Sequence, residues 1–297
     1  MAESRLANTN DKPKFSVAIR TETYQRLINE TLGDKKTALQ FIADISTVVA
    51  NNYQLSTCES GTILAAGLAA TTLKLPLNQS LGFAYIVPFG GKAQFQVGVK
   101  GYIQLAIRSG YYLDIDTDIV REGEYKGRDK QTGKPIFEFI EDDAEADKKA
   151  IIGYRAYFTL LNGFTKTVYW SKAKIEQHRD RYSKSAKSTG ATNLWRDQFD
   201  LMALKTVLRQ LISKWGIMSV EMQTAIEKDQ AVIKEDGTPD YVDNPENDGS
   251  VVVDQPQPTV EVKPEPKKEL PKPEPKKEVA KSDLPFPEVE KGIDDLF

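Results

Sequence analysis

Residues 94–110, with the sequence QFQVGVKGYIQLAIRSG, change from an alternating hydrophobic pattern to helical spacing, which predicts a strand followed by a helix. Gln94 and Gln96 point to one side of the expected strand. Projection of the helix separates an apolar arc from a polar set that consists of Lys100, Gln104 and Arg108. Strand and helix would share a face with amide and cationic donors and no carboxylate, which suits DNA phosphates and base edges. A solvated face that is basic by chance explains these positions equally well.

Similar patterns predict the other helices. Helices are expected at 21–32 and 35–51, and a third should begin with the capping box Ser56–Glu59 and continue through ILAAGLAATTL. A long helix is expected at 193–215, where Gly216 is a plausible stop.

Alternation and turn residues predict the strands. Two hairpins are expected, with turns at Gly90-Gly91 and Asn162-Gly163. Between them, alternation places one set of side chains, Leu113, Ile115 and Ile119, opposite a second set, Asp114, Asp116 and Asp118. The expected fold class is α+β, with a small and mostly antiparallel sheet that contains hairpins and is packed by helices.

Proline and charge divide the chain. Eleven of the fifteen prolines lie beyond residue 230, in a Lys- and Glu-rich segment that cannot bury enough apolar area to fold. Up to Gln230 there are 31 Lys and Arg against 26 Asp and Glu (net +5), and from Ala231 onward 9 against 17 (net −8). We expect an N-terminal arm at 1–34 that could provide an oligomer contact, a DNA-binding core at 35–230 and a disordered acidic tail at 231–297. The basic core suggests a nucleic-acid partner.

The positive charge is densest between Lys172 and Lys214, where ten basic residues occur with four acidic ones. Lys205 and Arg209 flank an apolar helical stripe, so we expect these two cations to line a surface groove. Aromatic residues between the charges could stack on bases of single-stranded DNA, although most aromatics at such spacing belong to a core. The loop 183–192 could close over a strand. The DNA-binding candidates of this region are Lys172, Arg179, Arg181, Lys184, Lys187, Trp195, Arg196, Lys205 and Arg209.

The composition argues against several kinds of site. One Cys and one His cannot form a zinc site of the usual spacing. Gly91-Lys92 lacks the flanking residues of a P-loop, so a reaction on DNA should proceed without ATP. Asp116 with Glu124–Lys126 resembles a metal-dependent nuclease site, but a solvated strand face is the favoured interpretation. We therefore predict no catalytic residue, metal or cofactor, and, without a membrane-length apolar stretch, a cytoplasmic protein.

Two long blocks resemble a known family. LPLNQSLGFAYIVPFGGKAQFQVGVKGYIQLAIRSGYY and LWRDQFDLMALKTVLRQLISKWG resemble the RecT family of phage single-strand annealing proteins, in the expected order. The resemblance implies a Rad52/Red-beta-like annealing core that coats single-stranded DNA, forms rings or filaments, and pairs complementary strands without ATP. By block position, the DNA-facing residues would be Gln94, Gln96, Lys100, Gln104, Arg108, Lys205 and Arg209. Val99 departs from the family pattern, which favours an aromatic residue there, and should affect packing more than binding.

The resemblance also implies partners. A phage-encoded annealing protein in the bacterial cytoplasm would hold single-stranded DNA and the annealed duplex, and would act beside a cognate phage exonuclease. A passive single-strand coating protein is the alternative.

The last residues, SDLPFPEVEKGIDDLF, resemble the acidic tip of bacterial single-strand binding proteins. We expect a docking peptide for a host partner, such as the host single-strand binding protein or a protein that it binds, formed by Asp294, Asp295, Leu296 and Phe297. A pseudo-substrate that competes for the chain's own groove and a merely solubilising tail are the alternatives.

Overall fold

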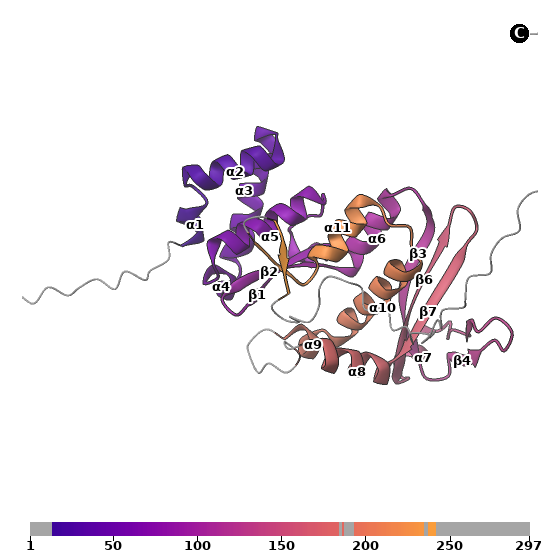
Figure 1. Ribbon diagram of the computed structural model, residues 1–297. Coiled ribbons are helices and arrows are strands. Elements are labelled where there is room, and N and C mark those ends of the chain that lie inside the picture. The colour runs from indigo at the N-terminus through magenta and orange to yellow at the C-terminus, as the bar shows by residue number, and fades with distance from the viewer. Residues whose placement is uncertain (1–13, 184–185, 187–192, 235–236, 242–297) are drawn as a thin grey trace, which may run out of the picture. The chain divides into compact units, whose positions relative to one another are not determined.

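The structure is a computed structural model that describes residues 14–183, 186, 193–234 and 237–241 (Figure 1). These residues belong to one compact unit of the chain. The helices are α1 (Phe15–Ala18), α2 (Glu22–Leu32), α3 (Lys35–Ala50), α4 (Tyr53–Ser56), α5 (Ser60–Thr72), η1 (Gln79–Leu81), α6 (Val99–Arg108), α7 (Asp143–Asp147), α8 (Lys172–Tyr182), α9 (Leu194–Asp197), α10 (Phe199–Trp215) and α11 (Val220–Lys228). The strands are β1 (Ala84–Phe89), β2 (Lys92–Val97), β3 (Tyr112–Arg121), β4 (Tyr125–Arg128), β5 (Pro135–Phe137), β6 (Ile151–Leu160), β7 (Thr165–Ser171), β8 (Val232–Ile233) and β9 (Pro239–Asp240).

A three-stranded antiparallel sheet, in the order β3-β6-β7, forms one half of the fold. The turn between β6 and β7 is the predicted one: Gly163 has a φ of +82°, and the Asn162 side chain accepts a hydrogen bond from the N–H of Phe164 at 3.0 Å. Helix α10 packs against all three strands (Figure 1). The predicted α+β class, with small antiparallel sheets and helices, is confirmed.

Strand β3 does not alternate as predicted. Register shifts occur between Tyr112 and Asp114 and between Val120 and Arg121, so the inward positions change along the strand. Leu113 lies within the first shift and is 67% exposed. From Asp114 to Val120 the pairing with β6 is continuous, so Val120 points to the face opposite Ile115, and both side chains are buried. Simple alternation missed this because it expects only one face of the strand to be buried.

The β1–β2 hairpin turns at Gly90-Gly91, as predicted, and packs on α5. Helix α6 starts directly after β2 and passes close to the chain before β1. A Cβ atom at Gly101 would lie 2.2 Å from the carbonyl oxygen of Phe83, so this approach requires glycine. The strand-to-helix transition expected at 94–110 is confirmed.

Two predicted helices are interrupted. The helix expected from Ser56 begins instead at Ser60, four residues later. Ser56 is the last residue of α4, and the Glu59 side chain does not form the hydrogen bond of the predicted capping box. Cys58 lies between the two helices, and its thiol donates to the carbonyls of Gln54 and Lys92 at 3.5 and 3.4 Å. Burial raises the pKa of this thiol, which gives Cys58 a packing role.

The long helix expected at 193–215 is likewise divided into α9 and α10. Gln198 leaves the helical conformation with φ −143° and ψ 50°. Asn193 begins α9 by accepting the N–H of Arg196. Helix α10 then ends at Trp215, next to the predicted stop.

The folded chain continues past Gln230, the expected end of the core. The N–H of Gln230 donates to the Phe95 carbonyl at 2.8 Å, and the N–H of Phe95 donates to the Ala231 carbonyl at 2.9 Å. This bridge attaches the β8–β9 segment to β2, and Tyr241 is buried. At the other end, Phe15 and Ile28 of the predicted arm join the common core. No helix in the described part of the chain is long and apolar enough to cross a membrane.

Candidate nucleic-acid interface

The predicted donor face of β2 and α6 is largely internal. Gln94 and Gln96 are only 3% and 8% exposed. Nε2 of Gln94 is buried without a hydrogen-bond acceptor among the described residues. Lys100 is exposed and Gln104 is half-buried. Arg108 is exposed, but its guanidinium donates to the carbonyls of Leu73 and Lys74 at the end of α5.

Lys205 and Arg209 do not present exposed cations to a groove, because their charged groups are directed to the buried carboxylate of Asp229; this corrects the expectation from the helical projection. Lys205 is 5% exposed, and its Nζ lies 2.7 Å from Oδ1 of Asp229. Nε of Arg209 lies 3.9 Å from Oδ2 of the same carboxylate, and its Nη2 donates to the carbonyl of Ile226. Burial lowers the pKa of Lys205, an effect that the Asp229 charge opposes.

Asp229 connects several elements in this interior cluster. Its carboxylate accepts the N–H of Val97 in β2 and the hydroxyl of Tyr102 in α6, each at 2.9 Å. Burial and then the Asp229 charge raise the pKa of Tyr102 well above its usual value, so its hydroxyl remains a donor. We call Lys205, Arg209, Tyr102 and Asp229 the Asp229 cluster. It joins β2, α6, α10 and the segment after α11.

Some of the predicted residues do converge on a pocket of about 410 Å³ between the β1–β2 hairpin and α10. Gln96, Lys100 and the side chain of Lys205 line it, together with apolar residues that include Leu201 and Met202. Among the described residues, no Asp or Glu lines this pocket. Three of the predicted residues thus meet in space, although Nζ of Lys205 is bound to Asp229 inside the fold.

The basic stretch around α8 is partly available. Lys172 and Arg181 are exposed. Nε atoms of Arg179 and Arg196 lie 2.7 Å from the carboxylates of Asp180 and Asp197, respectively, so acids adjacent in sequence offset both cations. Lys184 and Lys187 lie outside the described residues, as does the predicted docking peptide Asp294–Phe297.

Trp195 is not placed as a stacking platform. It is 7% exposed and packs edge-on against Phe199, with ring centroids 5.7 Å apart. The Trp195 ring packs at the junction of α9 and α10. It therefore has the core role that the sequence analysis gave as the alternative to base stacking.

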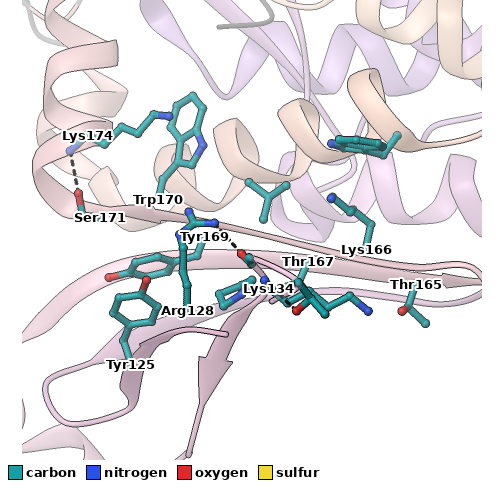
Figure 2. A pocket seen from close by; sticks show the side chains of 15 residues that line it. Tyr125, Arg128, Lys134, Thr165, Lys166, Thr167, Tyr169, Trp170, Ser171 and Lys174 are labelled. Atoms are coloured by element: carbon teal, nitrogen blue, oxygen red, sulfur yellow. Dashed lines mark hydrogen bonds between the residues drawn. The ribbon is translucent and has the colours of Figure 1, made fainter. Parts of the chain in front are cut away.

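A basic groove that the sequence reasoning did not identify follows β7, an edge strand of the sheet (Figure 2). We call it the β7 groove. It has a volume of about 480 Å³. Among the residues that the structure describes, its lining contains four cations, four large aromatics and no Asp or Glu. The cations are Arg128, Lys134, Lys166 and Lys174, and the aromatics are Tyr125, Tyr169, Trp170 and Trp215.

The β7 groove arises because β7 exposes both of its faces near the sheet edge. Lys166 pairs in register with the buried Phe158 and therefore points to the α10 side of the sheet. There its Nζ lies 4.0 Å from the centre of the Trp215 ring at the end of α10. Trp215 is 40% exposed, so one part of this ring is available to a ligand.

The β4–β5 hairpin builds the other wall. Tyr125 of β4 stacks on Tyr169 of β7 with ring centroids 4.4 Å apart and an interplanar angle of 23°. Arg128 donates to the carbonyl of Gly133 at 3.0 Å, which orients its guanidinium within the hairpin. Figure 2 shows Tyr125 and Arg128 on one side of β7 and Lys174 and Trp170 on the other.

Lys174 marks the end of the groove nearest α8. Its Nζ lies 4.2 Å from the centre of the Trp170 ring, and its backbone N–H donates to the Ser171 hydroxyl that begins α8. An ammonium held over an aromatic ring keeps its charge while its position is restricted. The groove therefore places cations beside aromatic surfaces, and the described residues of its lining include no Asp or Glu.

The nuclease alternative finds its key residues used by the fold. Glu124 is 3% exposed, and its carboxylate accepts the N–H groups of Arg121 at 2.6 Å and Ile140 at 3.2 Å. Nζ of Lys126 lies 3.0 Å from a carboxylate oxygen of Glu138. Among the residues described, no group of three His, Cys, Asp or Glu side chains could hold a metal ion.

Comparison with known proteins decides the family. The sequence profile of the RecT family matches residues 39–245, more than half of the chain. The chain belongs to the RecT family. Protein YqaK of Bacillus subtilis (strain 168), which is uncharacterized, is 45% identical over 227 residues, covering 76% of this chain and 73% of YqaK. Protein RecT of Escherichia coli (strain K12) is 28% identical over 208 residues, covering 65% of this chain and 72% of that protein.

Membership of the RecT family supports a role in DNA recombination through single-strand annealing. The matched range contains the whole β7 groove and the Asp229 cluster. It ends before the acidic segment at the end of this RecT-family chain.

Proposed function

We propose that this RecT-family protein binds single-stranded DNA along the β7 groove and anneals complementary strands without ATP. The observation that carries the proposal is the composition of that groove, in which the described lining residues supply four cations and no carboxylate. Lys, Arg and aromatic side chains in one open groove are the combination that binds a single strand without reading its sequence.

The mechanism follows from which part of the strand is held. Lys166, Lys174 and Arg128 would bind phosphates, while Tyr125 and Trp215 offer ring surface to one or two bases. Backbone contacts leave most base edges open to a second strand. Neutralised phosphates repel the incoming strand less, so pairing becomes faster, and the reaction requires no bond cleavage or nucleotide hydrolysis.

A single groove with four cations is a weak site. If each cation meets one phosphate, the logarithm of the binding constant should fall with the logarithm of salt concentration with a slope of about −2.8, or about fiftyfold between 50 and 200 mM salt. Stable coating therefore requires many subunits on one strand. We propose a ring or filament, in which residues 1–34 could contribute to the subunit contact.

The direct test is to mix complementary oligonucleotides with the protein, without nucleotide, and to follow duplex yield over time. Faster pairing than in buffer supports annealing. Tight binding with unchanged pairing would instead identify a passive coating protein. Intact end-labelled DNA after incubation with Mg²⁺ is expected, and degradation that is lost in Asp116→Ala would establish the nuclease alternative.

The cellular setting is part of the proposal. We propose that the protein acts in the cytoplasm of a phage-infected bacterium, beside a cognate exonuclease that exposes single strands. The host single-strand binding protein, or a protein that binds it, is the proposed host contact. Co-purification of each candidate with the full chain, with and without DNA, tests these contacts separately.

A further inference from the structure

The positive charge of the β7 groove is matched by a negatively charged segment at the end of the same sequence. Residues 282–297 contain five acidic residues and one lysine, a net charge of −4. Within them an aspartate is followed by Leu and Phe twice, as Asp283-Leu284-Pro285-Phe286 and as Asp295-Leu296-Phe297. Negative groups alternating with aromatic rings present the same two chemical features that a single strand offers to the groove, phosphate charge and flat ring surface.

The segment is also long enough to reach any position on the core. Forty residues, 242–281, separate Tyr241 from Ser282. An extended chain spans up to about 3.3 Å per residue, so this connector could exceed 100 Å. Attachment through such a connector gives the segment a local concentration on the order of 1 mM at the groove.

We propose that residues 282–297 occupy the β7 groove of their own chain when no DNA is present, as an acidic peptide competitor of the single strand. This inference rests on the proposed function of the groove. The acids would approach Lys166, Lys174 and Arg128, and a Phe ring would lie against Tyr125 or Trp215. A short oligonucleotide must displace the segment, whereas a long strand that engages many subunits does so easily.

The expected size of the effect follows from the local concentration. If the isolated segment binds with a dissociation constant of about 0.2–1 mM, tethering reduces the apparent affinity for a short strand about twofold to sixfold. Salt weakens the segment as well as the strand. Full-length protein should therefore show a shallower salt dependence than a variant whose segment no longer binds.

The test uses the full chain and labelled oligo(dT) at 50 mM salt. The tip variant carries Asp283→Asn, Glu288→Gln, Glu290→Gln, Asp294→Asn and Asp295→Asn. The matched control carries five Glu→Gln changes between the prolines, at Glu261, Glu265, Glu269, Glu274 and Glu278, and changes the net charge equally. We expect the tip variant to bind oligo(dT) twofold to sixfold more tightly than the control, with the difference lost at 300 mM salt.

Each outcome has a separate meaning. Equal affinities of the tip variant and the control would overturn the inference, because the tail would then act only through its net charge. A tip effect that persists after Lys166→Gln and Lys174→Gln would also overturn it, because the segment would bind elsewhere. If the two lysine changes alone leave DNA affinity intact, it is the proposed DNA groove that fails.

A second readout does not depend on DNA binding. A labelled peptide with the sequence of residues 282–297 should bind the tip variant with a dissociation constant below about 1 mM by fluorescence anisotropy. Lys166→Gln and Lys174→Gln in that variant should weaken it severalfold, whereas Lys35→Gln and Lys36→Gln should not. No peptide binding at millimolar protein would exclude the occupant even if the groove binds DNA.

Discussion

The β7 groove and the Asp229 cluster contain the same kinds of residues in opposite environments. Lys166 lies beside the partly exposed ring of Trp215 in an open groove, and the described residues of its lining include no acid. Lys205 and Arg209 lie in the interior around the carboxylate of Asp229. A cation is available to DNA only where no carboxylate already occupies it. Local positive charge along the sequence therefore does not show which cations are exposed, because this depends on the position of the acids in space.

The interior cations Lys205 and Arg209 also carry a desolvation cost, which an exposed cation does not have. Transfer of a charge from water to the interior is unfavourable unless a partner and hydrogen bonds compensate for it. Asp229 provides this partner, and in doing so it fixes β2, α6 and α10 relative to one another. We therefore assign the Asp229 cluster to the stability of the core, whereas DNA binding remains the proposed role of the β7 groove.

The largest expected effect is the loss of the central carboxylate. Asp229→Ala leaves Lys205 buried without its partner and should lower the free energy of unfolding by about 3–5 kcal/mol. Asp197→Ala breaks an exposed pair with Arg196, which solvent screens, and should destabilise the protein far less. Denaturant unfolding of both variants measures the difference. Equal costs would mean that the Asp229 cluster is not a dry interior site.

Unfolding at high pH tests the burial of a second polar group, the hydroxyl of Tyr112. Burial raises the pKa of Tyr112 to about 12, and its hydroxyl donates to the Ile217 carbonyl at 3.1 Å. Because the folded-state pKa is above the unfolded value of about 10, the stabilisation is complete below pH 10 and is lost as the pH rises towards 12. We expect Tyr112 to account for about 2 kcal/mol of lost stability between pH 9 and pH 12. The loss should be smaller by that amount in Tyr112→Phe, and an unchanged pH profile would contradict the assignment.

On the groove side, an aromatic residue should matter for binding rather than for folding. Trp215→Ala removes an exposed ring next to Lys166 and should weaken oligo(dT) binding about tenfold, within the range of about 1–3 kcal/mol for one stacked base. Tyr53→Ala is the matched control, because Tyr53 is 83% exposed and lies outside the groove lining. Equilibrium titrations at constant salt give both values. Equal affinities would exclude Trp215 as a base contact.

The sequence predicted the elements that depend on local chemistry. The Asn162-Gly163 turn, the β1–β2 hairpin and the start of α6 depend on residues within a few positions, and all three are confirmed. The two long blocks also identified the family correctly. Helix interruptions at Gln198 and between Ser56 and Ser60 were missed because a hydrophobic pattern can continue through a break in the backbone.

The candidate site was less predictable. Helical projection placed Lys205 beside an apolar stripe, but it contained no information on Asp229, which is 24 positions away along the chain. The β7 groove combines residues from β4, the β4–β5 turn, β7, α8 and the end of α10, which are far apart along the sequence. A signal existed in the strand sequence TKTVYWS, which contains one lysine, two aromatic residues and no acid. Its meaning depended on β7 being an edge strand, which only the fold could establish.

The most direct test of this account is the salt dependence of oligo(dT) binding by Lys166→Gln/Lys174→Gln, compared with Lys35→Gln/Lys36→Gln. If both groove lysines meet phosphates, the groove variant should lose about 1.4 from the magnitude of the log–log slope and bind about twentyfold more weakly at 0.1 M salt. The control pair, which is exposed at the start of α3, should leave slope and affinity within twofold of the parent. Equal slopes for the groove variant and the parent, with both proteins folded, would show that the strand does not bind along β7.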